Sequence, residues 1–143
     1  MRKASTFSLI RRVTREAEVD WLARHISAIE KDEEAVVVAG ADGRFVGQVE
    51  VNRRSGRSRH VGVLGISLLS GFRDVGIGTE LMREVEAQAK RLGIELLTLE
   101  VFASSGRARH VHANAGYRIV GCLPKGHLKD GKYIDSIMMS KEL

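Results

Sequence analysis

Three glycines stand just ahead of a stretch patterned as an amphipathic helix, in the segment "GFRDVGIGTELMREVEAQAKRLGIELLTLEV" at residues 71–101. They are Gly71, Gly76 and Gly78. The first backbone N–H groups of a helix have no partner within it, and the helix dipole adds about half a positive charge there. Glycines at that point let a diphosphate approach the backbone without meeting a Cβ. Gly76 and Gly78 could therefore cradle an anion, or they could serve a loop that needs positive φ angles and binds nothing.

Two well-known phosphate-binding motifs do not fit these glycines. The dinucleotide fingerprint G-x-G-x-x-G fails because Leu81 stands where its third glycine belongs. The P-loop fails because no Gly-Lys-Ser/Thr follows. On the glycines alone, the anion site and the unliganded loop both stay open.

Histidines and a lone cysteine suggest other chemistry. His110 and His112 are two residues apart on an expected helix, so they point to different sides, and no Cys or Asp completes a ligand set with His60. We therefore expect no metal site. Cys122 is the only cysteine, which excludes an internal disulfide and favours a cytoplasmic setting. We expect Cys122 to be a small core residue.

The chain carries a net charge of +5, which suits an anionic ligand without selecting one. The segment "NRRSGRSRH" forms an arginine-rich turn that is either solvated or in contact with an acidic ligand. A nucleic-acid-binding domain is a rival interpretation. Aromatic residues make up only 5% of the chain, however, so the interleaved aromatics of single-strand binders are missing and we do not expect a nucleic-acid partner.

The length of 143 residues suits one domain, residues 1–143, with one core. No apolar run approaches the roughly 20 residues that cross a bilayer, and the N-terminus lacks the apolar region of a signal peptide. A helix is predicted over about residues 8–30, with Val19, Leu22, Ile26 and Ile29 at helical spacing. Next come two strands in "AVVVAGADGRFVGQVEV", joined at Asp42-Gly43, and a third strand in "HVGVLGISLL".

The second half alternates helices and strands. A helix over residues 78–92 is expected to bury Leu81, Val85, Ala89 and Leu92, to pair Glu86 with Lys90, and to end at Gly93. "IELLTLEVFA" is predicted to be a strand covered on both faces. A short helix over 107–115 and a hairpin around Asp130-Gly131 follow. The order α-β-β-β-α-β-α-β-β predicts an α/β (α+β) fold, a mixed sheet with helices on its faces.

Three motifs carry a family resemblance over residues 45–143, about two thirds of the chain. "RDVGIG" resembles the R/Q-x-x-G-x-G/A signature with which GCN5-related N-acetyltransferases (GNAT) grip the pyrophosphate of acetyl-CoA. "LEVFASSGRARHVHANAGY" is similar to the family's L-E-V strand, Asn-rich turn and helix ending L-Y-E-K-L-G-F. "GCLPKGHLKDGKYIDSIMM" resembles the tail of amine and phosphinothricin-type acetyltransferases.

The resemblance implies a single N-acetyltransferase domain with the GNAT fold, in which two parallel strands splay apart and admit the pantetheine arm. Gly65 could form a bulge that opens the third strand. Acetyl-CoA would be the acetyl donor. The residues implied to bind it, mostly through main chain, are Ile66, Ser67, Leu68, Arg73, Asp74, Val75, Gly76, Ile77, Gly78, Thr79 and Ser105. The arginine-rich turn could also meet the 3′-phosphate of the coenzyme.

The resemblance also implies two catalytic residues. Glu100 occupies the position of the base in ribosomal-protein alanine acetyltransferases, although it could equally face solvent or pair with an arginine. His112 lies four residues before Gly116, where many relatives carry a proton-donating tyrosine. Either His112 protonates the departing thiolate or the thiolate leaves unaided. His60 is a minor alternative base.

The acceptor implied is a primary amine, either a small molecule or a protein N-terminus or lysine. Asp135 could meet that amine, or it could be a strand-end carboxylate. The family's first strand is not evident, so it is either missing or truncated, or a second copy completes the sheet edge in a homodimer. The absent tyrosine and asparagine also allow a non-catalytic acyl-CoA-binding protein.

Overall fold

The computed structural model describes residues 15–41, 44–69 and 76–143. Along these ranges the predicted order of elements is confirmed, with one 3-10 turn, η1, added between the second and third strands. The elements are α1 (Arg15–Glu30), β1 (Glu34–Ala41), β2 (Arg44–Arg53), η1 (Gly56–Ser58), β3 (Val61–Leu68), α2 (Ile77–Arg91), β4 (Leu96–Phe102), α3 (Gly106–Asn114), β5 (Arg118–Lys129) and β6 (Lys132–Glu142).

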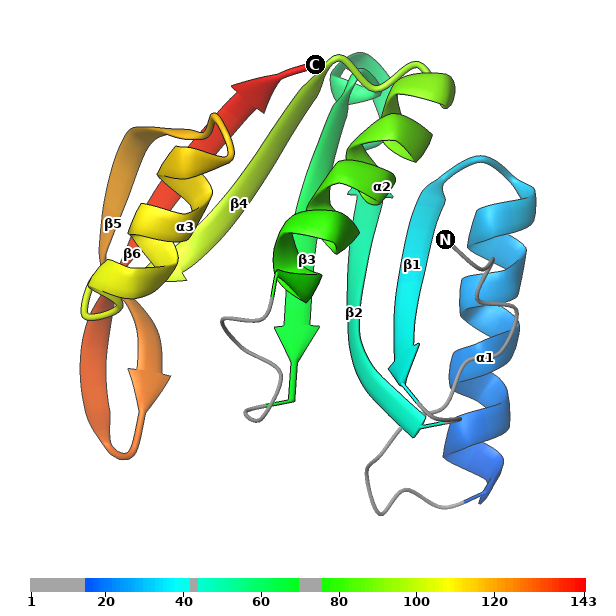
Figure 1. Ribbon diagram of the computed structural model, residues 1–143, viewed down its shortest axis with the longest axis horizontal. Coiled ribbons are helices and arrows are strands. Elements are labelled where there is room, and N and C mark those ends of the chain that lie inside the picture. Colours follow the sequence, from blue (N-terminus) through cyan, green and yellow to red (C-terminus); the bar gives the residue numbers. More distant parts are fainter. Residues whose placement is uncertain (1–14, 42–43, 70–75) are drawn as a thin grey trace.

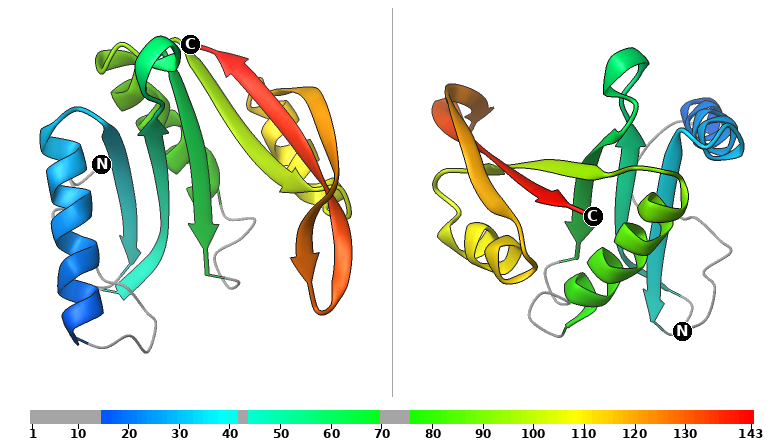
Figure 2. Two further views of the ribbon diagram at one scale, coloured as in Figure 1. Left: turned by 180° about the vertical axis from the view of Figure 1, so that it is seen from behind. Right: turned by 90° about the horizontal axis from the view of Figure 1, so that it is seen from above.

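The strands of the described part form one six-stranded sheet in the order β1-β2-β3-β4-β6-β5. β3 and β4 run parallel, and every other neighbouring pair runs antiparallel. Helices α2 and α3 lie on one face of the sheet, and α1 lies on the opposite face beside β1 (Figures 1 and 2). This is the mixed sheet flanked by helices that the sequence predicted.

Helix α2 anchors the core because its apolar stripe faces the sheet. Leu81, Val85 and Ala89 are buried as predicted, and Leu92 is partly buried. They belong to one apolar cluster with strand residues such as Val49 and Leu97, both of which are fully buried. Burial of each large apolar side chain contributes about 1.5–3 kcal/mol, so this stripe fixes α2 against the sheet.

The predicted hairpin turn between β5 and β6 is confirmed. Asp130 and Gly131 have φ angles of 52° and 73°, the two positive values that a two-residue type I′ turn requires. The hairpin extends beyond the end of β4, whose pairing with β6 stops at Phe102–Ser136 (Figure 1). The other predicted turn, Asp42-Gly43, lies outside the described residues.

Three expectations about side chains are wrong. In β4, Leu97, Leu99 and Val101 are buried, but on the other face Glu100 is exposed and its neighbours are only partly buried, so that face is open at Glu100 rather than fully covered. Cys122 is exposed on β5, not a core residue. Glu86 bonds to Lys141 and Tyr117 instead of pairing with Lys90. The pattern of one segment cannot reveal partners that come from distant strands.

The family's first strand, which was not evident in the sequence, would precede α1. Residues 1–14 lie outside the described residues. In α1, Ile26 and Ile29 are 53% and 44% exposed, so this end of the predicted apolar stripe is not buried by the described part of the chain. No helix in the described ranges is both long enough and apolar enough to span a bilayer.

Candidate active site

The parallel strands β3 and β4 separate after a short contact. They pair only at Val61–Leu96, Gly62–Leu97 and Val63–Thr98. Beyond that point β4 continues along β6, whereas β3 continues along β2 up to Leu68. The β4-facing backbone groups of the second half of β3 are therefore not used by β4. The predicted splay of the parallel strands is confirmed.

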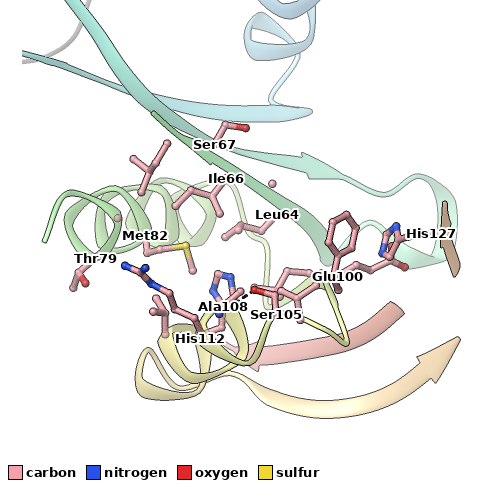
Figure 3. Close-up of a pocket in the computed structure, with 18 of the residues that line it drawn as sticks. Leu64, Ile66, Ser67, Thr79, Met82, Glu100, Ser105, Ala108, His112 and His127 are labelled. Atoms are coloured by element: carbon pink, nitrogen blue, oxygen red, sulfur yellow. Dashed lines mark hydrogen bonds between the residues drawn. The ribbon is translucent and has the colours of Figure 1, made fainter. Parts of the chain in front are cut away.

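A cleft of about 730 Å³ occupies this opening (Figure 3). It brings together residues from β3, the start of α2, β4, α3 and β5. Of the residues predicted from the sequence, those that line it are Ile66, Ser67, Leu68, Gly76, Gly78, Thr79, Glu100, Ser105 and His112. Segments up to 63 positions apart in the sequence thus meet at one place, as between Leu64 and His127.

The expected bulge at Gly65 is wrong. Pairing of β2 with β3 runs without a register shift from Gly47–Leu68 to Arg53–Gly62, through Gly65 itself. A Cβ placed on Gly65 would meet Glu50 at an ordinary 3.6 Å. The opening therefore comes from β4 leaving β3 to follow β6, and not from a distortion of β3.

At the N-terminus of α2, the two glycines have different roles. Gly76 is the N-cap and has φ 82° and ψ −4°, a left-handed conformation that costs a residue with a Cβ about 1–2 kcal/mol. Gly78 packs against β3, because a Cβ there would lie 3.3 Å from Leu68 Cδ1. Gly76 has no side chain that could cap the helix, and the first N–H groups of a helix have no intrahelical partner, so the first turn offers free donors where Gly76, Gly78 and Thr79 line the cleft.

Part of the predicted diphosphate loop cannot be described. Arg73, Asp74 and Val75 lie outside the described residues. Ile77 is described but its side chain packs against the core cluster rather than lining the cleft. Any contact of Ile77 with a ligand would therefore come from its main chain.

Glu100 lies on the open face of β4 and lines the cleft. Its neighbours along the strand, Leu99 and Val101, are buried on the other face because side chains alternate in a strand. The carboxylate is thus held at the cleft by two core residues while it remains open to solvent.

His112 is a buried member of the cleft wall, with 7% of its surface exposed. Its ring meets Tyr117 edge to face at 6.0 Å, and its Nδ1 is buried without a hydrogen-bond partner in the described part of the chain. Burial lowers the pKa of His112 from the ordinary 6.5, because the apolar surroundings disfavour the charged ring. The imidazole is accordingly neutral at pH 7.

Ser105 both caps α3 and lines the cleft. It is the N-cap of α3, and its Oγ accepts a hydrogen bond from the Ala108 N–H at 3.4 Å (dashed in Figure 3). It also lines the cleft. Since a hydroxyl can accept and donate at once, Ser105 retains its O–H for a ligand.

Tyr117 lies next to the cleft wall but belongs to a structural network. Its hydroxyl donates to Glu86 at 3.0 Å, and burial with the nearby Glu86 carboxylate raises the pKa of Tyr117 far above its ordinary range. Lys141 donates to Glu86 at 2.8 Å and to the Ala115 carbonyl at 2.9 Å. The network ties α2, the end of α3 and β6 together.

The arginine-rich turn and His60 do not border the cleft. Arg53 donates to the Leu92 carbonyl, so the turn lies beside the C-terminus of α2, where a cation complements the helix dipole. That end is about 22 Å from the helix N-terminus at 1.5 Å per residue. The 3′-phosphate contact is therefore not supported, and His60 is wrong as an alternative base because it lies at the far end of β3.

Sequence reasoning missed His127, which comes from β5 and lines the cleft near Glu100 (Figure 3). Its ring stacks edge to face on Phe102 at 4.6 Å. No local spacing links His127 to Glu100, so only strand pairing reveals their proximity. Asp135 does not line the cleft; its Oδ1 accepts from the Lys125 N–H at 2.9 Å, which favours the strand-end interpretation.

The residues present suit an acyl-CoA better than a metal ion. Among the described residues, no three His, Cys, Asp or Glu side chains gather where they could hold a metal. The cleft instead offers the main-chain edge of β3 that β4 does not use and the N-terminus of α2, which begins after Gly76. Those are the groups that a pantetheine amide and a diphosphate require.

Comparison with known proteins gives the same assignment. The chain matches the Acetyltransferase (GNAT) family over residues 4–117. It is 33% identical over 108 residues to the L-amino acid N-acetyltransferase AaaT of Escherichia coli strain K12. This alignment covers 73% of the chain and 66% of that relative, so the chain spans about two thirds of the relative's length.

Solved structures share the fold. The ribosomal-protein-alanine N-acetyltransferase from Brucella melitensis has a TM-score of 0.80 and 26% identity, covering 93% of this chain and 81% of that one. A phosphinothricin acetyltransferase from Sinorhizobium meliloti, in complex with acetyl-CoA, has a TM-score of 0.77 and 22% identity, covering 87% and 69%. With the family match and the splayed β3–β4 cleft, the chain belongs to the acetyltransferase (GNAT) family, which confirms the family predicted from the sequence motifs.

Proposed function

We propose that this chain transfers an acetyl group from acetyl-CoA to a small primary amine, directly and within one ternary complex. The observation that carries the proposal is the cleft between β3 and β4. One part of it has a free main-chain edge and a helix N-terminus, which suit an acyl-CoA. Glu100 lies in another part, where a carboxylate suits an amine (Figure 3).

The donor side would bind mainly through main chain. The pantetheine arm would run along Ile66, Ser67 and Leu68, which line the cleft beyond the last β3–β4 pair. The diphosphate would accept hydrogen bonds from backbone N–H groups of Asp74–Thr79, including those of Gly76 and Gly78. The O–H of Ser105 would donate to the pantetheine. Bound acetyl-CoA supplies the thioester carbonyl that the amine attacks.

Glu100 is proposed to take the proton that the amine must lose, directly or through water. An alkylamine with a pKa near 10.4 is almost fully protonated at pH 7, and freeing it costs about 4–5 kcal/mol. Glu100 can accept that proton because it lines the cleft and remains in contact with solvent. A positioned base of this kind contributes about 10²–10⁴-fold in rate.

His112 is proposed to assist the departing thiolate. As the nitrogen–carbon bond forms and the carbon–sulfur bond breaks, the sulfur leaves with the electron pair and needs a proton or a hydrogen bond. Because burial lowers its pKa, His112 is neutral at pH 7 and offers an N–H hydrogen bond rather than a cationic acid. We therefore expect His112 to contribute less than Glu100.

The choice of a small amine is supported by the tail motif and by the name of the Escherichia coli relative, an L-amino acid N-acetyltransferase. A protein N-terminus is the second candidate. It is favoured by Glu100, which matches the base of ribosomal-protein alanine acetyltransferases, and by the likeness to the Brucella enzyme.

The test is thiol release from acetyl-CoA by the purified chain, with three groups of acceptors: L-amino acids, simple alkylamines and peptides beginning with alanine. Turnover that favours small amines supports the proposal, and turnover confined to peptides replaces it with the second candidate. Tight coenzyme A binding without any turnover would make the chain an acyl-CoA-binding protein. Absence of coenzyme A uptake in calorimetry would refute all three.

A further inference from the structure

His127 has a polar atom that the fold buries but does not satisfy. Its Nε2 is buried without a hydrogen-bond partner among the described residues, and the ring lines the cleft. The ring is held edge to face against Phe102, with centroids 4.6 Å apart. Buried polar atoms nearly always have a partner, so an orphaned nitrogen in the wall of a cleft points to one supplied by a ligand.

Three unusual backbone features lie next to His127 in β5. Lys125 adopts a positive φ of 57°, and its N–H donates to Asp135 Oδ1 at 2.9 Å. A Cβ on Gly126 would lie 2.6 Å from the Ser136 Cβ, so only glycine fits between β5 and β6. The register of the pair shifts between Leu123 and His127. His127 directly follows these features in the chain and lines the cleft.

Charges of both signs surround the Phe102 ring. Glu100 precedes Phe102 by two residues on the same face of β4, a step of about 7 Å along the strand. On the hairpin side, His127 contacts the ring and the Lys129 Nζ lies over it, 5.6 Å from its centroid. One carboxylate and two nitrogen donors therefore lie around a single aromatic side chain.

We propose that His127, with Lys129 over the adjoining Phe102 ring, binds the carboxylate of an amino acid acceptor whose amino group faces Glu100. This assignment rests on the proposed acetyl transfer and names the acceptor class for the same cleft. An amino acid presents an ammonium and a carboxylate close together, which matches the two signs of charge in the neighbourhood of Phe102. An alkylamine or a peptide N-terminus has no α-carboxylate and would leave the His127 nitrogen unsatisfied.

The decisive measurement compares each L-amino acid that is acetylated with its carboxamide. The two share the side chain and the amino group, but the carboxamide has lost the negative charge. Because carboxamides also have a lower amine pKa, initial rates are compared at several pH values. In the wild-type chain we expect a KM at least tenfold lower for the acid at every pH.

Three variants test the residue itself. His127→Phe keeps an aromatic ring against Phe102 but removes the nitrogen, so the KM for amino acids should rise at least tenfold while the KM for carboxamides stays within twofold. His127→Gln restores a donor and should recover part of the loss. Lys132→Ala removes an exposed cation from the same hairpin and should change neither KM. Thermal unfolding of each variant shows whether it is folded.

Equal KM values for acid and carboxamide in the wild-type chain would overturn the assignment, as would a His127→Phe change that affects both substrates equally. Failure of the proposed function has a different signature, since no acceptor is then acetylated at all. In that case calorimetry with the coenzyme A complex and L-amino acids still tests the inference. Uptake that His127→Phe abolishes supports the site, and absence of uptake refutes it.

Discussion

The proposed donor and acceptor sides of the cleft come from different parts of the polypeptide. The donor side would use main chain from β3 and α2, which follow one another in the sequence. The acceptor side would use side chains, with Glu100 from β4 and both His127 and Lys129 from β5. β4 and β5 are joined only through β6, which pairs with both.

This difference determines which changes each side tolerates. A main-chain site depends on backbone angles and on the absence of a Cβ, so its sensitive positions are glycines. A side-chain site depends on charge and donor chemistry, so isosteric substitutions disrupt it while the backbone stays in place. Substitutions on the two sides should therefore separate cofactor affinity from acceptor chemistry.

The largest effect is expected from Glu100→Gln, which removes the proposed base and keeps the shape. Turnover should fall about 10²–10³-fold at pH 7, and the pH profile should move upward because the amine must then lose its proton to solvent. Coenzyme A affinity should not change. Steady-state rates from pH 6 to 10 measure both effects, and an unchanged profile would remove Glu100 as the base.

The second largest effect is expected from Gly76→Ala. A glycine substitution at the other end of the same helix shows how much of that effect is backbone strain alone. Gly76 and Gly93 flank the same helix with φ angles of 82° and 84°, and at neither would a Cβ meet another atom within 4 Å. Gly76→Ala and Gly93→Ala should each cost about 1–2 kcal/mol of stability. Only Gly76→Ala should weaken coenzyme A binding in calorimetry, by tenfold or more. Equal affinities would place the diphosphate elsewhere.

A smaller effect is expected from His112→Phe, which should lower turnover less than tenfold. It should also change how stability depends on pH. Because the folded pKa of His112 lies below the unfolded 6.5, the unfolded chain takes up this proton first, and stability is lost as pH falls from about 6.5 through the folded pKa. Urea unfolding at pH 7.5 and 5.0 should show a smaller loss for the variant.

The matched control for that experiment is His110→Phe, at an exposed position on the same helix. It should leave the acid-induced loss of stability as large as in the wild-type chain. If the two variants behave alike, burial of His112 does not control this part of the pH dependence.

The smallest effect on function is expected from Tyr117→Phe. The variant loses the hydrogen bond to Glu86 while the Lys141–Glu86 ion pair remains, so the cost should be about 1 kcal/mol. This corresponds to a drop in Tm of about 2–8 °C. The rate of acetyl transfer should not change, and a large loss of turnover would give the tyrosine a catalytic role instead.

Local patterns allowed much of the fold to be predicted. The apolar stripe of α2, the turn at Asp130-Gly131 and the alternation of helices with strands all depend on residues within a few positions of each other. The glycine motif predicted the uncapped N-terminus of α2 for the same reason. Local reasoning was wrong for Glu86, because its partner Lys141 comes from a distant strand. It was also wrong for Cys122, because the packing of the sheet leaves this residue exposed.

By itself, the sequence determined the family and the order of the elements, because these follow from short-range motifs, spacing and backbone preferences. The tertiary structure alone decided that β3 opens without a bulge at Gly65, that the arginine-rich turn lies at the far end of α2, and that His127 reaches the cleft near Glu100. The physical reason is that strand pairing joins residues far apart in the chain, and the chemistry of the acceptor side depends on which side chains that pairing brings together.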